Sequence, residues 1–141
     1  MPGKQTISQR LRQQVRERAE GKCEYCFLHD ESVLLPHEVD HVLAEQHGGQ
    51  TSLDNLAWSC YYCNHFKGTN ISSVDVTTGR IVPLFNPRSQ QWKRHFRLIG
   101  PRIEPLTASG RATESLLRFN TTTRIDERIA LMAAGHYFVQ K

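Results

Sequence analysis

The sequence predicts an α+β fold in which a short ββα unit is held together by a metal site. The first observation behind this is a set of two Cys-x-x-Cys pairs that lie far apart in the chain. The second is that residues 37–43 alternate as a strand does, with another short strand pattern at 56–59. The third is that residues 60–68 follow with the pattern of a helix that ends near a glycine.

Length and composition indicate one domain that spans residues 1–141. A chain of 141 residues is long enough for a single modest core, and an apolar content of 38% makes a stabilising metal useful. We expect the ββα core at about 37–70, an N-terminal basic helix at 7–20, and a C-terminal hairpin with helices at 74–135.

The segments on both sides of the core have recognisable patterns. In the N-terminal helix, every fourth residue from Ile7 to Ala19 is apolar, which predicts one packed face. A hairpin is expected around Gly79, because the strand patterns at 74–76 and 80–85 flank Thr-Thr-Gly. Further helices are predicted over residues 88–96, 110–119 and 122–134, the last with Ile125, Ile129 and Met132 on its apolar face.

The charge of the chain permits a nucleic-acid partner. Lysine and arginine number 18 against 14 acidic residues, and six of the basic residues fall in the first 22 positions. This segment either contacts phosphates or simply keeps the helix soluble, and the sequence favours neither. The residues concerned are Lys4, Arg10, Arg12, Arg16, Arg18 and Lys22, of which Arg12, Arg16 and Arg18 are our candidates for contact with DNA.

The sequence carries no sign of a membrane or of secretion. No apolar run approaches the roughly 18 residues of a membrane span, and the N-terminus lacks the apolar region of a secretory signal. We therefore expect a cytoplasmic protein with reduced cysteines and no association with membranes. No obligate protein partner is evident from the sequence.

The two cysteine pairs predict a structural zinc site. Two Cys-x-x-Cys pairs in a reduced, basic protein are typical of a tetrahedral site with four thiolates. A redox dithiol would not explain two pairs with no cysteine left over. Four thiolates leave no open position for water, so the zinc would be structural. Its ligands are Cys23, Cys26, Cys60 and Cys63.

Between and after these pairs lie residues suited to phosphodiester hydrolysis. The imidazole of His41 can accept a proton from water near neutral pH. Asp40 and Asn64 offer two hard oxygen ligands, which suit Mg²⁺. Lys67 lies one helical turn after Asn64, where it could contact the phosphate. Each residue alone would be weak evidence, and the signal is in their order.

In this order the sequence resembles the HNH endonucleases, in the subset with four zinc-binding cysteines. The resemblance rests on the first cysteine pair, EVDHVLAEQHGG at 38–49, LDNL at 53–56 and CYYCNHFKG at 60–68. It implies the ββα-metal fold, with His41 as general base. Asp40 and Asn64 are then the ligands of one Mg²⁺ or Mn²⁺ ion, and Asn55 is the amide that tethers the loop and orients the backbone of the histidine. The flanks, with DVTTGRIVPLFNPRSQQWKRHF and GRATESLLRFN, more loosely resemble the small stand-alone HNH proteins of bacteria.

The residues next to these have open roles. Glu38 shares a strand face with Asp40 and is a candidate for a third ligand or for a residue that supports a ligand. His37 lies on the face of His41, and a catalytic role for it is not favoured. His65 is expected at the surface or near DNA.

The sequence thus favours a metal-dependent endonuclease that hydrolyses phosphodiester bonds in DNA and, by the resemblance, leaves 5′-phosphate and 3′-hydroxyl ends. Two alternatives stay open. One is a zinc-stapled nucleic-acid-binding module without catalysis, and the other is a nuclease that acts on RNA.

Overall fold

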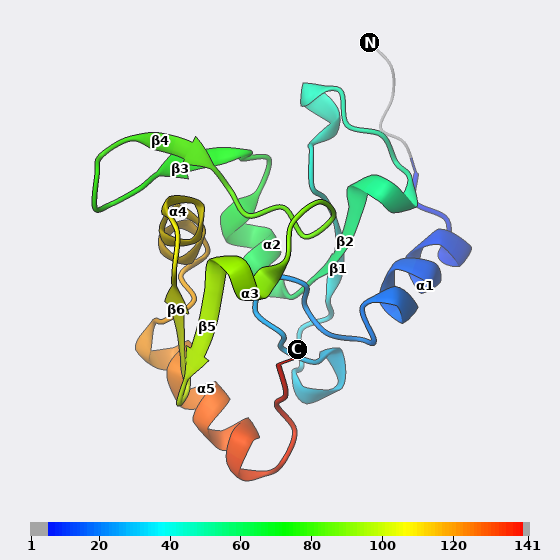
Figure 1. The fold of residues 1–141 in the computed structure, drawn as a ribbon. Helices are drawn as coiled ribbons and strands as arrows, with labels where there is room; N and C mark the ends of the chain where they lie inside the picture. Colours follow the sequence, from blue (N-terminus) through cyan, green and yellow to red (C-terminus); the bar gives the residue numbers. More distant parts are fainter. Residues whose placement is uncertain (1–5, 140–141) are drawn as a thin grey trace.

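A computed structural model describes residues 6–139 of the chain. In this range it contains five α-helices and three two-stranded antiparallel sheets, so the prediction of an α+β fold is confirmed. The ββα unit lies in the middle of the molecule, with helix α1 on one side and two further hairpins on the other (Figure 1).

The central unit consists of β1 (Glu38–His41), β2 (Leu56–Ser59) and α2 (Tyr61–Lys67). The two strands are antiparallel, and Asp40 lies opposite Ala57. All four residues of β2 are buried, because the strand is covered on both faces. The strand predicted at 37–43 is observed over the shorter range of β1, and the strand predicted at 56–59 is observed with the same bounds as β2.

Helix α1 (Gln9–Arg18) packs against β2 and is somewhat shorter than the predicted 7–20. The hydroxyl of Ser8 caps its N-terminus by accepting a hydrogen bond from the backbone amide of Leu11 at 3.1 Å. Val15, in the predicted apolar face, is fully buried in a small cluster with Leu56 and Trp58. The apolar stripe thus fixes the helix to the strand.

The first C-terminal hairpin is formed by β3 (Ser72–Val74) and β4 (Ile81–Pro83), close to the predicted strands around Gly79. Asp75, at the end of β3, is fully buried. Its carboxylate accepts two hydrogen bonds from the guanidinium of Arg111, at 2.8 and 3.0 Å. Because Arg111 belongs to α4 (Ala108–Leu117), this ion pair holds the hairpin against that helix.

The predicted helix over 88–96 is only partly confirmed, because residues 88–91 form a turn and loop and a second hairpin begins at Phe96. Only α3 (Trp92–His95) is helical, and the chain continues directly as β5 (Phe96–Ile99), which pairs with β6 (Arg102–Pro105). Gly100 makes the turn with a φ of 55°. Trp92 and Phe96 lie four residues apart, a spacing that suits either a helix or the junction of a helix with a strand. Because Phe96 pairs with Pro105 of β6, the helix ends at His95 and Phe96 begins a strand.

The last helix, α5 (Thr122–Ala133), runs beneath the hairpin β5–β6 in the view of Figure 1. Its length agrees with the predicted 122–134, but its buried face is different. Ile129, expected in the core, is 50% exposed, whereas Arg124 and Arg128 are the buried residues of the helix.

One apolar core joins the zinc-ligand candidates to the C-terminal part of the chain. The same cluster holds all four cysteines and side chains from β5, β6, α4 and the segment that follows α4. No helix in residues 6–139 has both the length and the apolar character that crossing a membrane requires. The C-terminal members of the cluster are Phe85, Phe96, Ile103, Leu117 and Phe119.

Candidate functional site

The four cysteines come together, as the sequence predicted. Cys23 and Cys26 lie in the loop after α1, Cys60 caps the N-terminus of α2, and Cys63 lies in its first turn. All four are at most 1% exposed, and their sulfur atoms lie within 4.8 Å of one another. Ligands of a tetrahedral zinc ion with 2.3 Å bonds are about 3.8 Å apart. The cluster could therefore hold a zinc ion.

The first cysteine pair is held in a tight turn by backbone contacts. The carbonyl of Cys23 accepts a hydrogen bond from the amide of Phe27 at 2.8 Å, and the amide of Cys23 donates to the carbonyl of Leu28 at 2.8 Å. Phe27 adopts a left-handed conformation with a φ of 64°. This turn allows both sulfurs of the pair to face the same point.

A buried arginine from α5 contacts the sulfur cluster. The Nη2 atom of Arg124 lies 3.4 Å from the sulfur of Cys63 and 3.7 Å from that of Cys60. Its Nη1 atom donates to the carbonyl of Leu117 at 2.8 Å. The side chain is 3% exposed. The sequence reasoning missed this residue because it assigned the buried face of α5 to isoleucine.

Asp40 faces α2 and is almost completely enclosed, with 4% exposure. Its carboxylate accepts a hydrogen bond from the hydroxyl of Tyr25 at 2.7 Å and pairs with the ammonium of Lys67 at 3.1 Å. Lys67 is 2% exposed and also donates to the carbonyl of His41 at 3.1 Å. Burial raises the pKa of Asp40, while Lys67 and Tyr25 oppose that shift. The structure thus brings Asp40 and Lys67 into direct contact.

His41 follows on the other face of β1, and its side chain is 16% exposed. Its Nε2 atom lies 2.9 Å from the hydroxyl oxygen of Thr51 and 3.4 Å from a carboxylate oxygen of Glu45. Glu45 and Thr51 both lie in the segment that connects β1 to β2. The sequence reasoning did not identify them, although Glu45 is an acidic residue four positions after the histidine.

Asn55 fastens this loop. Its amide oxygen accepts a hydrogen bond from the amide of Leu43 at 3.0 Å, and its Nδ2 atom donates to the carbonyls of Leu43 at 2.9 Å and Gln50 at 2.8 Å. A Cβ atom at Gly49 would lie 1.7 Å from the carbonyl oxygen of Leu43, so only glycine fits there. These side-chain contacts of Asn55 are with the loop rather than with the backbone of His41, while its backbone carbonyl accepts a hydrogen bond from the amide of Val42 at 2.9 Å.

Asn64 lies in α2, three residues before Lys67, and is half-buried. Residues three apart share a helix face, so Asn64 is on the side of α2 from which Lys67 reaches Asp40. The neighbouring His65 is exposed, and its ring stacks on that of Tyr61 with centroids 5.7 Å apart. The candidate metal ligands therefore come from the strand and the helix that face each other in the central unit.

His37 and Glu38, which come two and one residues before Val39 and the Asp-His pair, make contacts that support the fold. His37 is 1% exposed, and its Nε2 atom lies 2.7 Å from the carbonyl oxygen of Leu28, which ties β1 to the cysteine turn. Glu38 is exposed and lies 3.7 Å from Arg12.

The three arginines proposed to contact DNA all make contacts within the protein. These contacts fix α1 to the central unit and to the loop after the first cysteine pair. Lys4 lies outside the described residues. Arg12 donates to the carbonyl of His37 at 2.8 Å, Arg16 forms two bonds to Asp30 at 2.7 and 3.0 Å, and Arg18 donates to the carbonyls of Leu53 at 2.6 Å and Leu56 at 2.5 Å.

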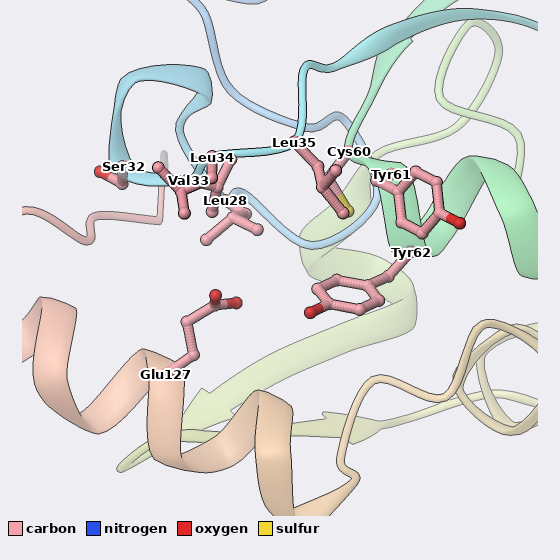
Figure 2. A pocket seen from close by; sticks show the side chains of 9 residues that line it. All are labelled: Leu28, Ser32, Val33, Leu34, Leu35, Cys60, Tyr61, Tyr62 and Glu127. Atoms are coloured by element: carbon pink, nitrogen blue, oxygen red, sulfur yellow. The ribbon is translucent and has the colours of Figure 1, made fainter.

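A cavity of about 350 Å³ opens beside the cysteine cluster (Figure 2). Cys60 forms part of its wall, and Glu127 of α5 points into it. Asp40, His41 and Asn64 are not among its lining residues, so it is separate from the candidate hydrolytic site. The other lining residues are Leu28, Ser32, Val33, Leu34, Leu35, Tyr61 and Tyr62.

Comparison with known proteins gives one match. Residues 23–70 match the family model described as HNH endonuclease. No curated protein and no solved structure matches the chain. The matched segment begins at the first cysteine and includes both cysteine pairs, the Asp-His pair, Asn55 and Lys67. Over residues 23–70, about a third of the chain, the sequence is therefore similar to the HNH endonucleases.

Proposed function

We propose that this protein is a metal-dependent endonuclease that hydrolyses phosphodiester bonds in DNA, with His41 as the general base. The observation that carries the proposal is the placement of Asp40 on β1, facing the helix with Asn64 and Lys67, with His41 next to it in the strand, inside the segment that matches the family. We also propose that residues 1–141 act as one domain, since the described flanks share a core with the cysteines.

The oxygen donors fit a hard divalent ion. Asp40 and Asn64 would hold Mg²⁺ or Mn²⁺, ions that bind few protein oxygens and keep several waters. A carboxylate offers about four lone-pair positions, and Tyr25 and Lys67 use only part of them in Asp40. Such an ion, when bound, stabilises the negative charge that develops on the phosphate. The cysteine cluster would hold a separate, structural Zn²⁺.

The protein's own residues would prepare the nucleophile. Thr51 and Glu45 approach the Nε2 atom of His41 and orient the imidazole. We propose that the other ring nitrogen, Nδ1, accepts the proton of the attacking water. Asn55 supports this arrangement indirectly, because it fastens the loop that carries Glu45.

Positive charge near the site would bind the backbone of the nucleic acid. Lys67 stays our candidate for a contact with the scissile phosphate, although its side chain is buried beside Asp40. Arg12, Arg16 and Arg18 stay candidates for contacts further along the backbone, with the donors that their internal hydrogen bonds leave.

One observation favours a second function, a zinc-stapled nucleic-acid-binding module without catalysis. Asp40 is already neutralised by Lys67 and hydrogen-bonded by Tyr25, so the strand and the helix are joined without an added ion. The remaining alternative is a nuclease that acts on RNA. It would use the same residues, so only a comparison of RNA and DNA as substrates distinguishes the two.

Cleavage of supercoiled DNA tests the proposal. The protein is incubated with Mg²⁺, Mn²⁺ or a chelator, beside His41→Ala and a control, His47→Ala, which changes an exposed histidine six residues away in the chain. We expect His41→Ala to lower the rate by a factor of about 10² to 10⁴ while DNA binding is kept. His47→Ala should cut normally.

The other outcomes decide between the alternatives. Equal cleavage by His41→Ala and the wild type would overturn the role of His41. Binding of DNA without cleavage, for every divalent ion, would establish the binding module. Cleavage of single-stranded RNA in preference to DNA would assign the enzyme to RNA.

A further inference from the structure

Arg124 is an unusual residue for the interior of a small domain. The residue is 3% exposed, and within residues 6–139 its Nε atom has no hydrogen-bond partner. None of the ion pairs among these residues includes Arg124. A buried charge without an opposite charge is strongly unfavourable, so the neighbours of Arg124 should supply one.

Among the described residues, the sulfur atoms are the groups in direct contact that can do so. Arg124 contacts Cys63 at 3.4 Å and Cys60 at 3.7 Å, and its other hydrogen bonds are to the backbone carbonyls of Leu117 and Arg118. Its guanidinium also lies over the rings of Tyr62 and Phe119, which carry no charge. The carboxylate of Glu127, in the next turn of α5, interacts with Arg124 electrostatically but forms no hydrogen bond with it. Four neutral thiols would leave the guanidinium uncompensated. Four thiolates around one divalent zinc carry a net charge of −2, and that charge is buried as well.

We infer that Arg124 is the counter-charge of the zinc–thiolate centre, and that α5 is therefore part of the metal site. The helix lies outside the segment that matches the HNH family, residues 23–70. Arg124 offsets one of the two negative charges and directs an N–H group at the sulfurs, as groups around metal ligands commonly do. The inference rests on the proposal that the four cysteines bind zinc.

The same helix provides a matched control. Arg128 lies one turn after Arg124 and is equally buried, with 3% exposure. Its donors contact the carbonyl of Pro101 at 2.6 Å, the carbonyl of Phe119 at 2.5 Å and the side-chain oxygen of Asn120 at 3.0 Å. None of these partners is a zinc ligand. Substitution of Arg128 therefore removes a buried arginine of the same helix that donates no hydrogen bond to a sulfur and interacts with Cys26 and Cys63 only through its charge.

The experiment measures zinc affinity in the full chain by competition with a coloured chelator, for wild type, Arg124→Met, Arg124→Lys and Arg128→Met. Circular dichroism selects variants with the native fold. We expect Arg124→Met to bind zinc 10 to 100 times more weakly than Arg128→Met, the range for the loss of a residue that supports metal ligands. Arg124→Lys, which keeps the charge, should stay within a few-fold of the wild type.

The outcomes separate this inference from the zinc proposal. A folded wild-type protein that binds no zinc would overturn the zinc proposal itself. A wild type with one zinc per chain, together with equal affinities for Arg124→Met and Arg128→Met, would overturn the role of Arg124 alone. Equal losses in Arg124→Lys and Arg124→Met would also overturn it, because charge would then be irrelevant. If Arg124→Met does not fold, Arg124→Gln, which keeps an N–H donor but no charge, takes its place.

Discussion

The tether formed by Asn55 offers a quantitative test of how the loop after β1 is held. Asn55→Ala removes three hydrogen bonds, one from the amide of Leu43 and two to the carbonyls of Leu43 and Gln50. The loop between these residues includes Glu45, which approaches His41 at 3.4 Å. Loss of these hydrogen bonds should therefore make both the loop and the side chain of His41, the candidate base, more mobile.

The expected loss of stability follows from these contacts. A net contribution of about 0.5–1.5 kcal/mol for each hydrogen bond gives roughly 1.5–4.5 kcal/mol for three. Asn55 is only half-buried, so water replaces part of what is lost. We expect a decrease of about 2 kcal/mol in the free energy of unfolding, which lowers the melting temperature by roughly 5–10 °C in a domain of this size.

Thermal unfolding and hydrogen exchange together measure the effect. The control is Asn70→Ala, which removes a single hydrogen bond, from its side chain to the carbonyl of Lys67 at 3.0 Å. Asn55→Ala should destabilise the protein more than the control does, and the amide of Leu43 should exchange faster. The reasoning is refuted if the two variants lose the same stability and the exchange of Leu43 is unchanged.

Three further predictions concern neighbouring residues. Lys67→Met leaves the buried carboxylate of Asp40 without its cation, so urea unfolding should show a loss of about 3–5 kcal/mol, and adding Asp40→Asn should recover part of it. Gly49→Ala forces the backbone away from Leu43, so its melting temperature should fall and the loop should lose exchange protection. Burial lowers the pKa of His37 below its ordinary value of about 6.5. The unfolded chain then binds a proton that the folded chain does not, so stability should fall as the pH drops below about 6.5, and His37→Gln should reduce that dependence. A dependence on pH that is the same in His37→Gln would contradict this account.

Local patterns were sufficient to predict the central unit. Cysteine spacing indicated that the four sulfurs converge, and alternation placed a strand across Asp40 and His41. These features depend on neighbours in the sequence. The placement of Asn55 beside the loop was also expected, although its partners are Leu43 and Gln50 rather than the backbone of His41.

The contacts that the sequence did not reveal join distant parts of the chain. Tyr25 lies between two zinc-ligand candidates, and nothing local indicates that its hydroxyl reaches Asp40. In α5, isoleucines spaced along one face suggested the core, but the cluster of sulfur atoms makes a buried arginine favourable on another face. The attraction between the arginine and the sulfur atoms thus outweighs the preference for burying the isoleucines. A pattern of apolar residues does not reveal which charged residue will find an opposite charge in the core.

The hydroxyl of Tyr137 donates a hydrogen bond to the carbonyl of Cys26 at 2.5 Å, across 111 positions of the chain. A ribosome makes the first cysteine pair early and Tyr137 late, after Arg124. During synthesis, the nascent polypeptide thus presents all four cysteines before the residues that cover them exist. We expect a chain arrested when Cys63 has left the ribosome, but before Arg124 is made, to exchange its metal rapidly with the surrounding zinc pool, and tight retention to begin only once α5 and Tyr137 have emerged.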